Sequence, residues 1–128
     1  MRILQAPYNI ANVAWGTALG LRGLGHDAEV WQVEPNKFSF PCDRTFPFPP
    51  PDWRSLVKLI EEALDSFDAY HFHYGGSLVP RQRGSLPALW DLPLYRNAGK
   101  RVAFTFHGSD VRLGSVYAAG NRWWALVR

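Results

Sequence analysis

Polar turns follow two runs of strand-forming residues in this sequence, and each turn carries glycine together with polar side chains. Residues 69–73 lead into Tyr-Gly-Gly-Ser, and residues 102–106 lead into His-Gly-Ser-Asp. A histidine in such a turn can donate a hydrogen bond to an oxyanion or exchange a proton near neutral pH. Glycine lets a ligand approach the backbone, and free N–H groups at a helix start favour phosphate or carboxylate. Both turns therefore have the chemistry of a ligand-binding site.

The two turns meet only if their strands are parallel, because parallel strands bring all their carboxyl ends to one edge, where open α/β sheets bind ligands. The loop of residues 8–13, after the first strand, then joins the same edge. The residues that we expect at this edge are Asn9, Asn12, His73, Gly75, Gly76, His107, Gly108, Ser109 and Asp110. Some of these residues also have a purely structural interpretation. The glycines can be turn residues, and Asp110 can be a helix N-cap.

Metal chemistry is one alternative for the histidines. His71 and His73 are two positions apart and share one face of a strand, and His107 could be a third ligand. No carboxylate or cysteine completes a convincing set, so we expect no metal and keep a metal hydrolase only as an alternative. The sequence has no dinucleotide fingerprint after its first strand, no P-loop and no nucleophile elbow.

The hydrophobic pattern predicts the elements that must position these residues. Strands are expected at residues 2–6, 27–33, 69–73 and 100–106, and helices at 15–24, 53–67, 91–99 and 114–128. Asp52 is the expected N-cap of the second helix. The buried stripe expected on that helix consists of Trp53, Leu56, Val57, Ile60, Leu64 and Phe67.

Residues 34–51 are rich in Pro and Phe and favour an extended path across the domain surface. An edge strand within this segment is compatible with the pattern, and we do not expect its four phenylalanines all to be solvated. The predicted order is β-α-β-loop-α-β-α-β-α. This alternation predicts a single α/β domain over residues 1–128, Rossmann-like, with a parallel sheet and helices on both faces.

Composition narrows the class of protein. Of 128 residues, 47% are hydrophobic and 20% are charged, as in a soluble globular domain. The net charge of +3 is spread too thinly to predict nucleic-acid binding, although it suits anionic ligands. Cys42 is the only cysteine, no apolar run is long enough for a membrane span, and no signal peptide opens the chain. We therefore expect a cytoplasmic protein, with peripheral membrane contact left open.

Three stretches together resemble a known family. Residues 19–30, with Gly-His-Asp-Ala-Glu-Val at their end, resemble the helix-to-strand passage of GT-B glycosyltransferases. Residues 67–75 resemble the histidine-bearing strand of that fold, and residues 91–110 resemble the strand that leads into its H-G-x-D turn. The resemblance is to the N-terminal domain of family-4-type retaining glycosyltransferases and covers nearly the whole chain.

The resemblance implies an enzymatic function and a separate role for each of two domains. Such enzymes move a sugar from a nucleotide-sugar donor to a hydroxyl acceptor; the N-terminal domain recognises the acceptor, and the C-terminal domain holds the donor. It further implies that His107 is the catalytic residue beside the transferred sugar, that Asp110 orders its turn and that no metal is generally required. We expect no cofactor. In many members the loop after the first strand carries Gly-Gly and closes over the donor phosphates; here it reads Asn9-Ile-Ala-Asn12.

The donor domain is missing from these 128 residues, so we expect this chain to be inactive alone. It would be a fragment, a truncated product or half of a split enzyme, and a homodimer through apolar surface near Trp123 and Trp124 stays open. The alternative to an enzyme half is a non-catalytic Rossmann-like binding module. The donor sugar, the acceptor and the pathway are not specified by the sequence.

Overall fold

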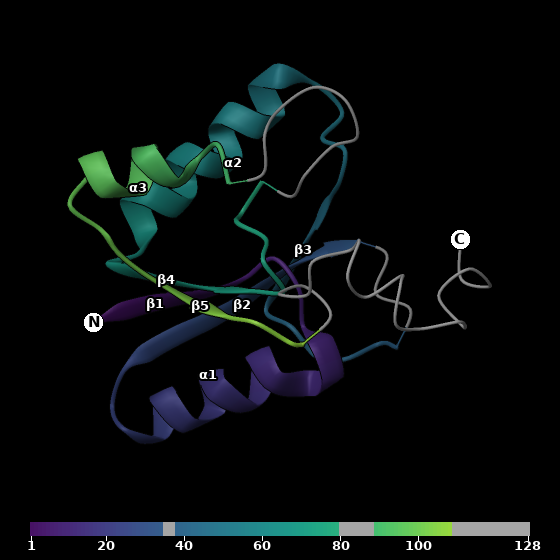
Figure 1. The fold of residues 1–128 in the computed structure, drawn as a ribbon, viewed down its shortest axis with the longest axis vertical. Coiled ribbons are helices and arrows are strands. Elements are labelled where there is room, and N and C mark those ends of the chain that lie inside the picture. The colour runs from purple at the N-terminus through teal and green to yellow at the C-terminus, as the bar shows by residue number, and fades with distance from the viewer. Residues whose placement is uncertain (35–37, 80–88, 109–128) are drawn as a thin grey trace, which may run out of the picture.

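A computed structural model describes residues 1–34, 38–79 and 89–108 (Figure 1). Its strands are β1 (Arg2–Ala6), β2 (Asp27–Glu34), β3 (Arg44–Pro47), β4 (Ala69–His73) and β5 (Arg101–Thr105). Its helices are α1 (Val13–Gly23), α2 (Trp53–Ser66) and α3 (Leu92–Asn97), and a short turn, η1 (Ile10–Asn12), precedes α1. The predicted helix at residues 114–128 lies outside the described part of the chain.

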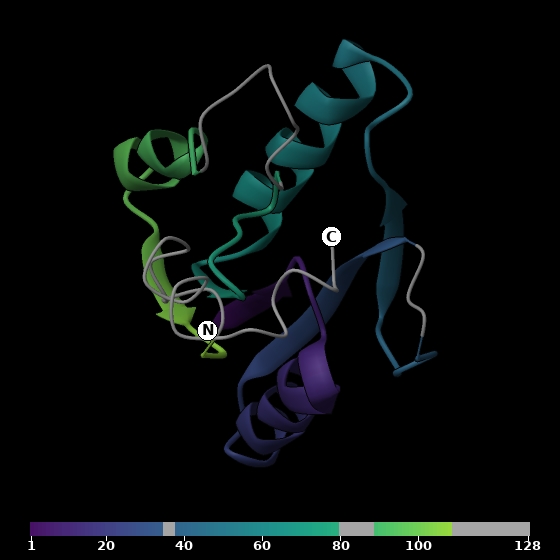
Figure 2. The same cartoon turned by 45° about the vertical axis from the view of Figure 1, so that its right-hand side comes forward.

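The five strands form one sheet in the order β3-β2-β1-β4-β5, and every neighbouring pair is parallel. Helix α1 covers one face of this sheet, whereas α2 and α3 lie on the other (Figures 1 and 2). The expectation of a Rossmann-like α/β fold with a parallel sheet and helices on both faces is therefore confirmed.

The two faces of the sheet bury different side chains. Under α2 and α3 the core is large and aromatic, and includes Leu4, Tyr70, Phe72 and Tyr95. Under α1 the core is small. It consists of Ile3, Ala14, Ala18, Ala28, Val30 and Ala69. Small residues on both partners let the α1 backbone approach the sheet closely, which explains why the buried positions of α1, Ala14 and Ala18, are both alanine.

Helix α2 follows its predicted course but buries a narrower stripe than expected. The carboxylate of Asp52 accepts a hydrogen bond from Ser55 N at 2.7 Å, which confirms the N-cap. Leu56, Ile60 and Ala63 are buried, whereas Trp53 is 63% exposed and Val57 is 47% exposed. The prediction was wrong for these last two side chains, because only the row of residues spaced four, three and four apart faces the protein interior.

The Pro/Phe-rich segment does contain an edge strand, β3, which extends the sheet beyond β2. Phe46 on this strand is 4% exposed, and Phe48 packs against α2 residues. Phe38 is 77% exposed and stacks on Phe40. The segment thus lies across the domain edge, with its aromatic side chains divided between core and surface.

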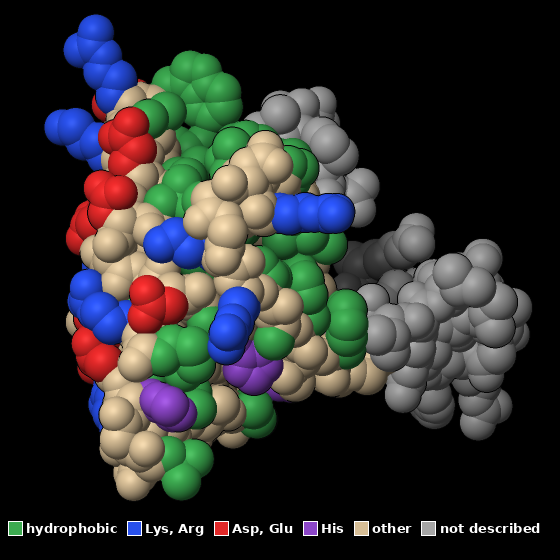
Figure 3. Space-filling model, turned by 90° about the vertical axis from the view of Figure 1, so that its left-hand side faces the viewer, with side chains coloured by type: hydrophobic (Ala, Val, Ile, Leu, Met, Phe, Trp, Pro, Cys, Tyr) green, Lys and Arg blue, Asp and Glu red, His purple; other side chains and the backbone are tan. Residues whose placement is uncertain are grey.

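Across the surface drawn in Figure 3, acidic and basic side chains lie side by side along one border, with hydrophobic side chains exposed beside them. Among the helices of the described residues, none has the length and apolar character needed to cross a membrane.

Candidate functional site

The sheet has a switch point between its two central strands. Strand β1 leads into α1 on one face of the sheet, and its neighbour β4 leads onward to α3 on the opposite face (Figure 1). The connections therefore diverge at the carboxyl ends of β1 and β4, and such divergence opens the crevice in which α/β sheets bind ligands. The residues that follow these two ends, from Pro7 and from Tyr74, define the candidate site.

The structure brings the histidines of the two predicted turns together. The ring centroids of His73 and His107 are 5.7 Å apart, and those of His71 and His73 are 4.4 Å apart. His71 Nε2 lies 2.7 Å from Thr105 Oγ1 on the neighbouring strand. His73 Nε2 lies 2.9 Å from Oε1 of Gln5. The result is a row of polar side chains across β1, β4 and β5.

Burial keeps His71 and His73 uncharged. His73 is fully buried. Its pKa is lowered to about 4, first by burial and then by the neighbouring His71 and His107. The pKa of His71 is also lowered, by burial and by His107. Both imidazoles are therefore neutral at pH 7 and can act as hydrogen-bonding groups but not as counter-ions for phosphate.

Two buried polar atoms of this row have no hydrogen-bond partner within the described residues. They are Nε2 of Gln5 and Nδ1 of His73. Because Gln5 Oε1 can only accept, His73 must donate from Nε2, which leaves Nδ1 as an acceptor. Gln5 therefore offers a donor and His73 an acceptor, each in a side chain that is fully buried.

The hydrogen bonds of His71 and His73 also bear on the hypothesis that these histidines bind a metal ion. The Nε2 atoms of His71 and His73 already face Thr105 and Gln5. In the part of the chain that the structure describes, no three His, Cys, Asp or Glu side chains are grouped to hold a metal ion. The geometry gives the metal hydrolase alternative no support.

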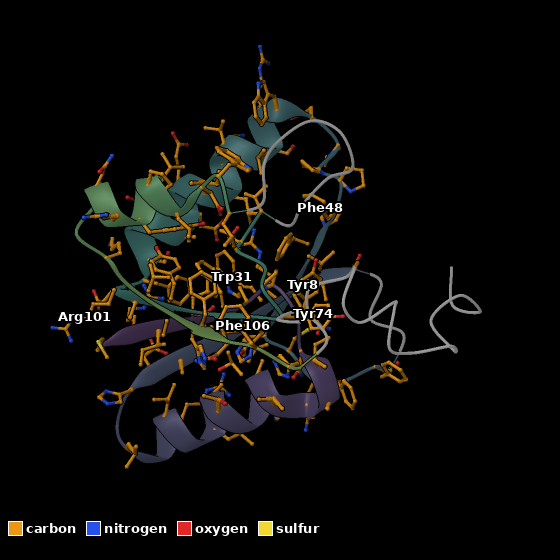
Figure 4. The ribbon with its side chains drawn as sticks, viewed as in Figure 1. Tyr8, Trp31, Phe48, Tyr74, Arg101 and Phe106 are labelled. Carbon is orange, nitrogen blue, oxygen red and sulfur yellow. The ribbon has the colours of Figure 1, made fainter. Side chains whose placement is uncertain are left out.

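The turn after β4 is held in an uncommon backbone conformation. Tyr74 and Gly75 both adopt left-handed φ angles, of 58° and 59°. Tyr74 N donates to Thr105 O at 3.0 Å, which ties this turn to the end of β5. The Tyr74 ring lies 6.3 Å from the His107 ring and meets Tyr8 edge to face (Figure 4).

Glycine is needed at the three predicted positions for different structural reasons. A Cβ atom at Gly76 would lie 3.0 Å from Tyr8 Cε2 and 3.1 Å from Pro7 Cγ, so this glycine makes room for the protein's own loop. Gly75 and Gly108 instead occupy left-handed φ angles, of 59° and 91°. All three lie at the carboxyl edge of the sheet, as predicted.

Asn9 and Asn12 shape the loop after β1. The Asn9 amide is buried and donates to Pro41 O at 3.0 Å and to Asn12 Oδ1 at 3.3 Å. Its oxygen accepts from Trp15 N at 3.3 Å, in the first turn of α1. Asn12 has a left-handed φ of 63°. The Asn9 side chain is thus engaged within the protein.

Sequence reasoning left several residues of the site out of its candidate set. They are Gln5, Tyr8, Tyr74 and Thr105. Tyr8 and Tyr74 could have been found, since each lies within two residues of a predicted strand end. Gln5 and Thr105 could not, because their partners depend on strand order. Of the predicted residues, Ser109 and Asp110 lie outside the described part of the chain.

Two surface grooves lie elsewhere on the domain. One, of about 560 Å³, runs between α3 and β5 and is lined mainly by Leu92, Pro93, Val102 and Phe104. The other, of about 360 Å³, lies between β3 and α2 beside Arg44 and Lys58. Neither is lined by the histidine row.

Comparison of the chain with family models, with curated protein sequences and with solved structures gave no match.

Proposed function

We propose that this domain is the acceptor-side half of a retaining GT-B glycosyltransferase, which moves a sugar from a nucleotide-sugar donor to a hydroxyl acceptor. The observation that carries the proposal is the convergence of His73, His107 and Tyr74 at the carboxyl edge of a parallel sheet. Two strands that are distant in sequence bring these side chains to the place where α/β sheets bind ligands.

The chemistry of the edge favours an acceptor over a diphosphate. The side chains gathered there are amides, imidazoles, phenols and a threonine hydroxyl: Gln5, Tyr8, His71, His73, Tyr74, Thr105 and His107. None of them is Lys or Arg, the usual partners of phosphate. A neutral ligand rich in hydroxyl groups matches this set.

His107 is the residue that we assign to the reacting sugar. It is at the end of the row, where its imidazole can contact a hydroxyl of the transferred sugar and donate a hydrogen bond as charge develops there. The resemblance of residues 91–110 to the H-G-x-D turn supports the same assignment. A cytoplasmic location is part of the proposal, since Cys42 has no cysteine to pair with.

The proposal requires a second domain for the nucleotide sugar. The described residues form one sheet, so that domain lies outside them, in the same polypeptide or in a partner chain. The test combines this domain with its donor domain, supplies UDP- and GDP-sugars together with simple glycosides, and follows product by mass spectrometry and its anomeric configuration by NMR. Transfer with retention that needs both parts supports the proposal. Ligand binding without any product would contradict it and favour a non-catalytic binding module.

A further inference from the structure

Two tyrosines form an aromatic corner at the switch point of the sheet. Tyr8 follows β1 and Tyr74 follows β4, and their ring centroids are 6.1 Å apart at an angle of 89°. Figure 4 shows the two residues beside each other at the ends of these strands. In this arrangement the edge of one ring meets the face of the other.

Tyr74 is kept at the surface by its backbone. Its φ of 58° is uncommon for a residue with a side chain, and the hydrogen bond from Tyr74 N to Thr105 O holds it there. The side chain remains 40% exposed despite its size. Backbone held in this sparsely populated region recurs at ligand-binding sites.

The Tyr8 ring is held in place by the turn after β4. The ring packs against the backbone of Gly76, where a Cβ atom would approach Tyr8 Cε2 to 3.0 Å. Burial, reinforced by Tyr74, raises the pKa of the Tyr8 phenol above its usual value. Its hydroxyl is therefore neutral at physiological pH and can donate or accept a hydrogen bond.

The corner and the histidine row together describe the shape of a ligand. An aromatic face suits a flat, weakly polar surface, such as the contiguous C–H groups on one side of a pyranose ring. The His107 ring, 6.3 Å from Tyr74, lies where it can reach the hydroxyl groups around the edge of such a ring. A sugar offers both surfaces in one molecule.

We propose that Tyr74, supported by Tyr8, stacks on the pyranose ring of the acceptor and so selects sugars by their C–H face. The choice of a sugar as ligand rests on the proposed function. Tyr74 binds and positions the acceptor in this account, and it takes no part in bond making or breaking.

The experiment titrates the chain with methyl β-D-galactopyranoside, which has a contiguous C–H face, and follows the tyrosine ring signals by NMR. Glycerol serves as the ringless polyol, and uridine tests for a nucleobase site. Tyr74→Phe keeps the ring and should bind the glycoside as the wild type does. Asparagine tolerates a left-handed φ but has no ring, so Tyr74→Asn should bind the glycoside about fivefold more weakly than the wild type. Trp53→Ala removes an exposed aromatic side chain on α2 and should change nothing.

Equal affinity in Tyr74→Asn and wild type would overturn the proposal, as would binding of uridine in place of the glycoside or no glycoside binding at all. If Tyr74→Asn does not fold, Tyr74→Gly provides the same test, since glycine adopts this φ without strain. If glycoside binding depends on Tyr74 but the two-domain assay shows no sugar transfer, the proposed function is wrong and the Tyr74 binding site still stands. Transfer that does not depend on Tyr74 would remove only the stacking site.

Discussion

The side-chain oxygen of Gln5 on β1 lies 2.9 Å from Nε2 of His73 on β4, so a buried polar contact joins the two central strands of the sheet. Both side chains are fully buried. The contact lies at the switch point, where the connections leave on opposite faces of the sheet. It fixes the His73 ring beside His107, and burial keeps that ring in its neutral form by lowering its pKa.

Stability should therefore depend on pH through His73. Its pKa is about 4 in the folded protein and about 6.5 in an unfolded chain. Between these values the unfolded state binds more protons, so the free energy of unfolding should fall as the pH is lowered from about 6.5 to about 4. The loss attributable to His73 is at most about 3 kcal/mol and is absent above neutral pH. Urea unfolding at a series of pH values measures it.

The control for this prediction is His73→Gln, which keeps a neutral polar side chain without a titrating group. The difference between the two unfolding curves should shrink as the pH falls. Parallel pH profiles for wild type and variant would show that His73 does not titrate as described. His71 stays in both proteins and contributes a smaller slope of the same sign, because its pKa is also lowered.

Much of the fold follows from local pattern. The runs at residues 2–6 and 69–73 coincide with β1 and β4, because each is a short run of strand-forming residues followed by a turn signal, Pro7 in one case and the glycines Gly75 and Gly76 in the other. The Asp52 cap and the periodic residues behind it likewise placed α2 to within a residue. These signals lie within a few residues of each other, so no knowledge of the tertiary fold is needed to read them.

The site itself depends on contacts that no local pattern contains. Gln5 looks like one polar residue in a buried strand until strand order places it beside His73. The Tyr8–Tyr74 pair likewise exists only because β1 and β4 are neighbours. Trp53 failed as a core prediction for a related reason, since helical periodicity does not say which turns of a helix other elements cover.

Gly76 should not tolerate a side chain. Alanine there would place its Cβ 3.0 Å from Tyr8 Cε2 and 3.1 Å from Pro7 Cγ, so the loop after β1 must shift. We expect Gly76→Ala to destabilise the domain by about 2 kcal/mol and to move the Tyr8 ring signals in NMR spectra. Gly20→Ala is the matched control: its Cβ meets nothing within 4 Å and it lies inside α1. That variant should gain about 1 kcal/mol, and equal effects from both changes would contradict the packing at Gly76.

Asp91 should be a large contributor to stability. This fully buried carboxylate accepts hydrogen bonds from Ser77 Oγ at 2.5 Å and from Tyr95 OH at 2.8 Å, which joins the turn after β4 to α3. Asp91→Asn places amide hydrogens where acceptors are needed and should cost about 2 kcal/mol in urea unfolding. Asp65→Asn, on the exposed side of α2, should stay within about 0.5 kcal/mol of wild type. A loss at Asp91 no larger than at Asp65 would rule out this role.

The most direct test of the account is the rate of sugar transfer by the combined acceptor and donor domains when His107 is replaced. His107→Ala should lower the initial rate about a hundredfold, because a hydrogen-bonding group beside the reacting sugar is lost. Phe106→Ala, at the exposed neighbouring position, should retain most of the activity. A His107→Ala rate equal to that of wild type would contradict the assignment of this edge of the sheet to the reaction.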